Sequence, residues 1–256
     1  MATEPVESGD MAGFPVDPLH QFEIQRYIPI QIGNLDLSFT NSALWMLITV
    51  GLACFIMMFG IRGRAIIPTR LQSVAEIFYE AITNMVKETV GRDGEKYFPF
   101  IFTLFMFVLI GNLLGMNPLP GAFTFTSHIV VTFAMAIVIF IAVTIIGFSI
   151  HGLGYLRLFF PHGAPGWTAV ILVPIELISY LSRPVSLSMR LFANMMAGHI
   201  LLKVFAGFVI MTGVVGIVPF AALIGITALE ILVSVLQAYI FTILTCVYLH
   251  DALHLH

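Results

Sequence analysis

Long runs of apolar residues, separated by short polar breaks, dominate the hydrophobicity pattern of the chain. The first run, 37–61, carries no formal charge and is long enough to cross a membrane, because about 20 apolar helical residues span the hydrocarbon core. Two further runs, 97–117 and 127–151, are separated by a turn rich in proline and glycine at 117–121. A last run occupies 220–250. The pattern predicts a membrane-crossing helix for each of these runs.

The central stretch, 167–211, is too long for one upright crossing. As a continuous helix at about 1.5 Å per residue it would reach roughly 65 Å, twice the thickness of the hydrocarbon core. It is therefore either two crossings or one strongly tilted helix. Residues 70–92 follow a different pattern, in which Leu71, Phe78 and Met85 share an apolar face opposite charged side chains. That pattern predicts an amphipathic helix on the membrane surface.

The composition is that of a membrane protein. Hydrophobic residues make up 59% of the chain and charged residues only 10%, far from the values of soluble domains. We therefore predict an all-α polytopic protein with about five membrane-crossing helices and one surface helix. Residues 1–36 form a polar N-terminal segment, and residues 37–256 form a single membrane domain surrounded by lipid. No basic patch interleaved with aromatic residues suggests nucleic acid as a partner.

The distribution of basic residues predicts the orientation of the chain. If the crossings alternate, all but one of the basic residues beside helix ends fall on one side, and only Arg26 lies on the other. The positive-inside rule then makes the N-terminus periplasmic. Counting the central stretch as one crossing makes the C-terminus cytoplasmic, whereas two crossings would export it. The residues on the cytoplasmic side are Arg62, Arg64, Arg70, Lys87, Arg92, Lys96 and Arg157.

The first 36 residues match neither a secretory signal nor an arginine-rich transit peptide. This favours a bacterial gene product, and hence a protein of the bacterial inner membrane. The two cysteines, Cys54 and Cys246, lie in separate apolar segments, so neither a disulfide framework nor a metal knuckle is expected.

Polar residues interrupt the central stretch at regular intervals. A charged group inside a bilayer costs roughly 2.5–3.5 kcal/mol, so such residues are usually retained for a pathway or a partner. On a helix, His199 and Lys203 fall nearly opposite Arg190, and Gly198 lies where the polar residues change from one face to the other. At about 100° per residue, the residues that share the main polar face are Glu176, Ser179, Arg183, Ser186, Arg190 and Asn194.

Arg190 is the strongest functional candidate on this face. Its guanidinium is not deprotonated in proteins, so it cannot relay protons, but it can hold an opposing carboxylate in the ionised form. Arg183 allows two structural interpretations, since it could reach the cytoplasmic headgroups or pair with Glu176.

Glu176 and Glu230 are the two carboxylates of the membrane-embedded sequence. A buried carboxyl group can exchange protons near neutral pH. Glu176 begins the central helix on the cytoplasmic side, whereas Glu230 lies in a helix entered from outside. Two proton-accepting sites therefore lie on different sides of Arg190. Asn194 and Gln237 could hydrogen-bond water beside Glu230 or, alternatively, join neighbouring helices.

The run SRPVSLSMRLFANMMAGH at 182–199 resembles the signature of subunit a of the F-type ATP synthase. Residues 230–245 resemble the last helix of that family, and GNLL at 111–114 and SHI at 127–129 fit it as well. The resemblance implies a long tilted helical hairpin in the C-terminal half, two offset half-channels and no bound cofactor. The implied partners are a ring of c subunits, b-type peripheral stalk subunits and the other subunits of the complex.

The resemblance also implies roles for single residues. Arg190 would separate the two half-channels. Many bacterial relatives have an acid at the position of His199 and a histidine at the position of Glu230. In this chain the two are exchanged, as in mitochondrial-type sequences. The outer half-channel would be lined by His199, Glu230, Asn194, Gln237, Asn112 and His128, and the cytoplasmic half-channel by Glu176, Ser179, Ser186 and Arg183.

A proton-coupled secondary transporter is the main alternative, but no inverted repeat or pair of broken helices indicates one. The sequence contains neither GxxxxGK[ST] nor HExxH, so we expect no nucleotide site, no zinc protease and no enzyme activity of this subunit alone. The titratable path favours H⁺ over Na⁺. Metal-like spacing occurs near the C-terminus, but a solvated, unanchored tail is the expected state of His250, Asp251, His254 and His256.

Overall fold

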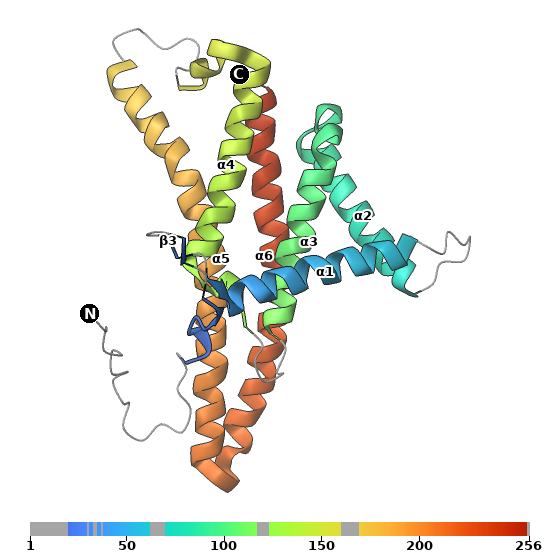
Figure 1. Cartoon of the computed structure of the whole chain (residues 1–256), viewed down its shortest axis with the longest axis vertical. Helices are drawn as coiled ribbons and strands as arrows, with labels where there is room; N and C mark the ends of the chain where they lie inside the picture. The colour runs from blue at the N-terminus through green and yellow to red at the C-terminus, as the bar shows by residue number, and fades with distance from the viewer. Residues whose placement is uncertain are drawn as a thin grey trace.

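Helices make up nearly all of the part of the chain that the structure describes (Figure 1). The computed structural model describes residues 20–29, 31–32, 35–36, 38–61, 70–116, 123–159 and 169–254. The α-helices are α1 (Asn41–Ile61), α2 (Arg70–Thr89), α3 (Phe98–Gly115), α4 (Ile129–His151), α5 (Ala169–Thr212) and α6 (Ile217–Leu253).

Short 3₁₀ helices and two small antiparallel β pairs complete the fold. Strand β1 (Arg26–Ile28) pairs with β4 (Phe39–Thr40), and β2 (Gln31–Ile32) pairs with β3 (Leu35–Asp36). The 3₁₀ helices are η1 (His20–Phe22), η2 (Arg92–Tyr97), η3 (Phe125–Ser127), η4 (Gly152–Phe159) and η6 (Gly213–Gly216).

The predicted fold class is confirmed. Within the described residues, five helices (α1 and α3 to α6) are long and apolar enough to cross a membrane. Their limits fall close to the runs read from the hydrophobic pattern, and α2 occupies the segment predicted to be amphipathic. Ile82 and Val86 of α2 are buried where it packs against α1, α3 and α6, whereas Val74 on the same helix is exposed. The apolar face of α2 is therefore partly used for packing within the protein.

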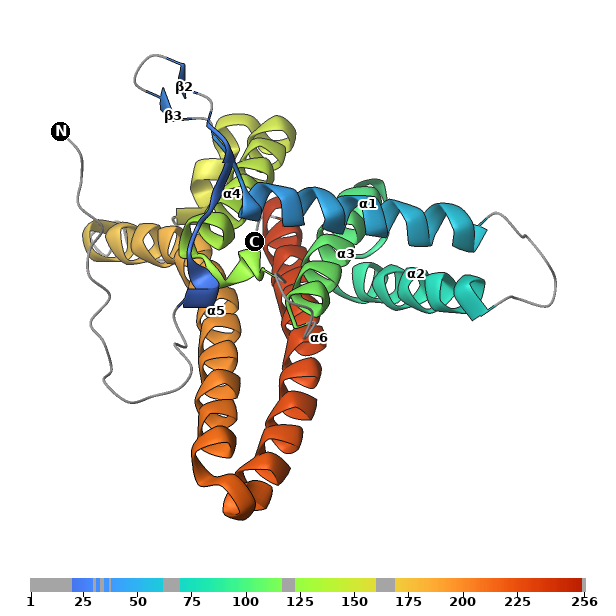
Figure 2. The same ribbon diagram turned by 60° about the horizontal axis from the view of Figure 1, so that its bottom comes forward.

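The central stretch forms one continuous helix, α5, rather than two separate spans. Pro174 and Pro184 lie inside it, and a proline removes one helical hydrogen bond and crowds the preceding turn. Figure 2 shows α5 bent between its first part and the part that runs beside α6 to the turn at η6. Prolines account for most sharp kinks in helices, so they explain how a continuous helix of this length follows a curved course.

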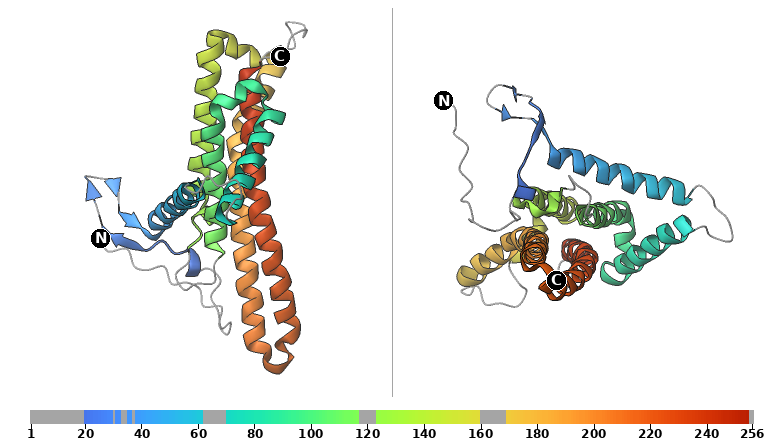
Figure 3. Two further views of the ribbon diagram at one scale, coloured as in Figure 1. Left: turned by 90° about the vertical axis from the view of Figure 1, so that its right-hand side faces the viewer. Right: turned by 90° about the horizontal axis from the view of Figure 1, so that it is seen from below.

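The α5–α6 hairpin is the longest unit of the fold and extends well beyond the other helices (Figure 1). Helix α1 runs across the long axis of the bundle, as the two further views in Figure 3 also show. If α1 crosses the membrane upright, the hairpin lies strongly tilted to it. The buried core lies where α5 and α6 meet α3 and α4, and it includes Leu109, Ile139, Leu191 and Phe241.

The end of α6 is anchored, so the expectation of an unanchored histidine tail is wrong for residues 250–254. His254 Nε2 lies 3.7 Å from Asp93 Oδ2 in η2, and His151 Nε2 lies 3.1 Å from the backbone oxygen of Leu253. His256 lies outside the described residues. Elements η2, η4 and the end of α6 consequently gather at one end of the molecule (Figure 1). In the part of the chain that the structure describes, no three metal-ligating side chains are grouped.

Gly147 allows a close approach between α4 and η4. A Cβ atom added at Gly147 would overlap the ring of Tyr155, a fully buried tyrosine. We predict that Gly147→Ala lowers the free energy of unfolding by about 1–3 kcal/mol, because over-packing forces neighbouring groups out of place.

Gly51→Ala in α1 is the matched control, since nothing lies within 4 Å of its added Cβ atom. Higher helix propensity should leave that variant as stable as the wild type or more so, by about 1 kcal/mol at most. Thermal denaturation in detergent measures both effects. Equal midpoints for the two variants would show that the Gly147 contact does not limit packing.

Candidate functional site

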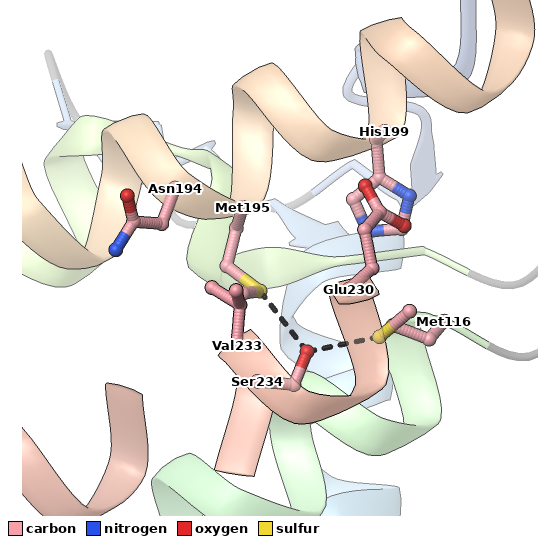
Figure 4. A pocket seen from close by; sticks show the side chains of 7 residues that line it. All are labelled: Met116, Asn194, Met195, His199, Glu230, Val233 and Ser234. Carbon is pink, nitrogen blue, oxygen red and sulfur yellow. Dashed lines mark hydrogen bonds between the residues drawn. The ribbon is translucent and has the colours of Figure 1, made fainter. Parts of the chain in front are cut away.

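Polar residues from the middle of α5 and α6 meet in a small pocket where these helices face the end of α3 (Figure 4). Its volume of about 10 Å³ is roughly the room that one water molecule needs. The pocket is lined by Met116, Asn194, Met195, His199, Glu230, Val233 and Ser234. Three of these are outer half-channel residues predicted from the sequence, so the fold does bring them together.

Glu230 projects from α6 toward α5 and is only 9% exposed. Its carboxyl group packs against Gly198, where an added Cβ atom would overlap Oε1. Neither carboxyl oxygen has a hydrogen-bond partner among the described residues. Because buried polar atoms are almost always hydrogen-bonded, this group is suited to hold water or a proton.

His199 lies beside Glu230 on the α5 side of the pocket and is 8% exposed (Figure 4). Its Nε2 atom lies 2.9 Å from Oγ1 of Thr124, which precedes η3. This hydrogen bond orients the imidazole ring, and it thereby also sets the direction in which the second ring nitrogen, Nδ1, points. The arrangement places one imidazole and one carboxyl group together in an apolar setting.

Asn194 and Gln237 join α5 to α6 directly. Nδ2 of Asn194 donates a hydrogen bond of 2.8 Å to Oε1 of Gln237. Gln237 is 1% exposed, and its Nε2 has no partner in the described part of the chain. The pair therefore serves as a link between helices, as one of the two sequence interpretations held, and still leaves a buried donor for water.

Asn112 lies in α3, where it contacts η3 and the pocket residue Ser234, and His128 lies between η3 and α4. Asn112 is fully buried, donates from Nδ2 to the Ser234 backbone oxygen at 3.3 Å, and accepts from Thr126 Oγ1 at 2.9 Å. The ring of His128 stacks on Phe123 at 5.0 Å between centroids, and its buried Nε2 has no described partner.

The N-terminal segment covers this region. The ring of Phe22 in η1 lies nearly perpendicular to both histidine rings, with its centroid 6.5 Å from that of His128 and 6.4 Å from that of His199. The two histidines, which lie 71 residues apart in the sequence (199 − 128), thus share one aromatic neighbour. Sequence reasoning gave no role to Phe22.

Arg190 lies one helical turn before Asn194 on the polar face of α5, nearly opposite His199. It is exposed, whereas the next residue, Leu191, is fully buried. Within the described residues its guanidinium makes no hydrogen bond or ion pair. The helix therefore presents an unpaired cation outward, on a surface that a partner can approach.

The predicted cytoplasmic residues are spread along the first half of α5. Ser179 and Ser186 are exposed and Glu176 is half-buried, and no side-chain hydrogen bond joins them in the described structure. The suggestion that Arg183 pairs with Glu176 or reaches the headgroups is replaced by a different contact. Nη1 of Arg183 donates to Oδ2 of Asp251 in α6 at 3.0 Å.

Sequence reasoning missed three polar residues at these contacts: Thr124, Ser234 and Asp251. Ser234 Oγ lies 2.9 Å from the sulfur of Met116 at the end of α3. A signal was available for Thr124, because Thr124, Thr126 and Ser127 form a polar run directly before His128 in an otherwise apolar region. Asp251 was assigned to the tail because its partner lies 68 residues away.

Comparison with known proteins places this site in a family context. A profile of the family "ATP synthase A chain" matches residues 43–250, which include every site residue described except Phe22 and Asp251. A protein of Rhodospirillum rubrum named ATP synthase subunit a is 61% identical over 240 residues, covering 93% of this chain and 99% of that protein.

Two further proteins of the same name show similar agreement. The one from Paramagnetospirillum magneticum is 58% identical over 245 residues, covering 94% of this chain and 99% of that protein. The one from Parvibaculum lavamentivorans is 57% identical over 261 residues and covers 99% of both chains. The chain therefore belongs to the ATP synthase A chain family.

Proposed function

We propose that this chain is the proton-conducting stator subunit of an F-type ATP synthase in the bacterial inner membrane. Two offset half-channels would carry protons to and from carboxylates on a rotating ring of c subunits, and Arg190 would separate them. The observation that carries the proposal is the unpaired, exposed Arg190 on α5, the helix whose buried His199 lies beside the buried carboxyl group of Glu230 from α6.

The outer half-channel would lead through the pocket at the α5–α6 contact. His199 and Glu230 would pass the proton, since each can bind and release one. Asn194 and Gln237 would hold water beside them, and Asn112 and His128 would line the entrance. Unpartnered buried atoms on Glu230, Gln237 and His128 support this route, because each provides a place for a water molecule.

The c ring would pack against the face of α5 that carries Arg190. Ala193 and Ala197 lie one and two helical turns further on and are exposed, so a partner helix could approach closely there. A ring carboxylate arriving at Arg190 would lose its proton, because a nearby permanent cation favours the ionised form.

Protons would leave toward the cytoplasm past Glu176, Ser179 and Ser186. In this orientation the N-terminus is periplasmic, and the end with η2, η4 and the C-terminus is cytoplasmic. One charge crossing yields about 2.3 kcal/mol per 100 mV, which would drive rotation. ATP chemistry would belong to other subunits of the complex, and b-type stalk subunits would hold this chain stationary.

Glu230 and His199 are predicted to act as a unit. Glu230→Gln should slow proton-driven ATP synthesis in membrane vesicles at least about tenfold, since a positioned proton carrier typically contributes about 10²–10⁴-fold to a proton transfer. The double exchange His199→Glu with Glu230→His should recover part of the rate, because it restores one acid and one imidazole.

Glu88→Gln on the exposed face of α2 is the control and should leave synthesis unchanged. Rates are compared at equal amounts of assembled subunit. Wild-type synthesis in the Glu230→Gln vesicles would rule out this assignment.

The contact at Gly198 provides a steric test of the same pair. Gly198→Ala should displace the Glu230 side chain and reduce synthesis several-fold, because the added methyl group has no free space. Gly225→Ala in α6, whose Cβ atom would meet nothing within 4 Å, should behave as the wild type. If both alanine variants synthesise ATP equally well, the carboxyl group does not need its observed position.

Arg190 is predicted to be essential for coupling. Arg190→Ala should abolish ATP synthesis, while passive proton flow through vesicles stripped of the soluble catalytic head should persist or rise. Arg190→Lys retains a charge but loses the planar guanidinium, so we expect it to fail in synthesis too. Arg92→Ala, an exposed arginine of η2, is the control. Near-normal synthesis in the Arg190→Ala vesicles would overturn the proposed function.

A further inference from the structure

Arg183 is bound on several sides, unlike Arg190 one heptad later in the same helix. Its Nη1 donates to Oδ2 of Asp251 at 3.0 Å, with the two side chains 27% and 32% exposed. Its guanidinium carbon lies 5.4 Å from the ring centroid of Tyr180 and 5.1 Å from that of Tyr248. The charge is therefore neutralised by α6 and shielded by two aromatic rings. These four residues are called the clasp below.

The clasp is tied to the rest of the bundle through Tyr180. The Tyr180 hydroxyl lies 2.6 Å from Oγ1 of Thr144 in α4 and 3.0 Å from the hydroxyl of Tyr155 in η4. Tyr180 is 9% exposed and Tyr155 only 1%. A continuous polar network thus joins α4, η4, α5 and α6 at one level of the bundle.

The clasp also lies at one of the two prolines that interrupt the backbone hydrogen bonds of α5. Pro184 follows Arg183 directly, and a proline cannot donate to the carbonyl four residues earlier, which here is that of Tyr180. The helix therefore lacks its own hydrogen bond at the residue whose side chain the clasp holds. External contacts, rather than the α5 backbone, stabilise the course of the helix there.

We infer that the clasp is a positioning device that fixes the bend of α5 and thereby the placement of the exposed Arg190. Arg183 and Asp251 then carry no protons themselves, in contrast to a lining role in the cytoplasmic half-channel. By neutralising Arg183, the clasp also leaves Arg190 as the unpaired arginine of this helix within the described residues. The inference rests on the proposed function, since it assigns Arg190 its role.

Neutralising one partner at a time tests the clasp. Asp251→Asn and Arg183→Gln should each lower ATP synthesis about tenfold and raise the passive proton leak, because each leaves a partly buried charge without its partner. Asp93→Asn is the control, since its contact with His254 is longer, at 3.7 Å, and its side chain is 70% exposed. That variant should match the wild type.

Double substitutions of Arg183 and Asp251 show whether these residues position the helix or carry protons themselves. The double variant Arg183→Gln with Asp251→Asn leaves no unpaired charge and keeps a hydrogen-bonding pair, so it should recover most of the synthesis rate and the low leak. The charge exchange Arg183→Asp with Asp251→Arg should recover part of both. All rates are measured in vesicles with the whole complex, at equal amounts of assembled subunit.

Two results would overturn the inference. Wild-type synthesis and leak in Asp251→Asn would show that the clasp positions nothing. Loss in the single variants without recovery in either paired variant would show that one of the groups acts individually. Arg190→Ala, measured in the same preparation, separates these results from a failure of the proposed function. If the proposed function is wrong, the Arg190→Ala vesicles synthesise ATP. If only the clasp inference is wrong, they do not.

Discussion

A polar side chain buried in an apolar bundle must find a hydrogen-bond partner, and this requirement governs how α5 and α6 pack. Along their contact, Asn194 bonds Gln237 at 2.8 Å and Arg183 bonds Asp251 at 3.0 Å. Each bond joins the two helices at a defined register, because a shift of one residue would turn the partners away from each other. The remaining contacts are largely apolar, and because apolar attraction has no direction, they specify the register less strictly.

The same requirement explains why the unsatisfied groups are informative. Most polar atoms of the bundle are paired, yet Glu230 and Nε2 of Gln237 are buried without a described partner, and Arg190 is exposed without one. Such groups are costly in an apolar protein unless water, a proton or a partner subunit completes them. These are the groups to which the proposed function assigns proton transfer and the contact with a partner subunit.

Small residues determine how closely these groups can approach. Gly198 lets the carboxyl group of Glu230 lie against the α5 backbone, and Gly147 lets Tyr155 reach the position from which its hydroxyl meets that of Tyr180. Both sites therefore depend on the absence of a side chain as much as on the polar groups themselves.

The sequence by itself determined the elements of this protein. Runs of apolar residues and turn signals located the helices close to their observed ends, since helical periodicity and span length are local properties. Residue chemistry also singled out Arg190, Glu230 and His199, because charged and titratable groups are rare in apolar segments. A characteristic motif tied these residues to a family, which the comparisons then established.

Only the tertiary structure decided which partners these residues find. The bond between Thr124 and His199 spans 75 residues and that between Arg183 and Asp251 spans 68, so no local pattern reveals either. For the same reason the sequence left α5 open between one helix and two, and it treated the anchored end of α6 as a free tail. Periodicity specifies which face of a helix is polar, but the packing of distant helices specifies what that face meets.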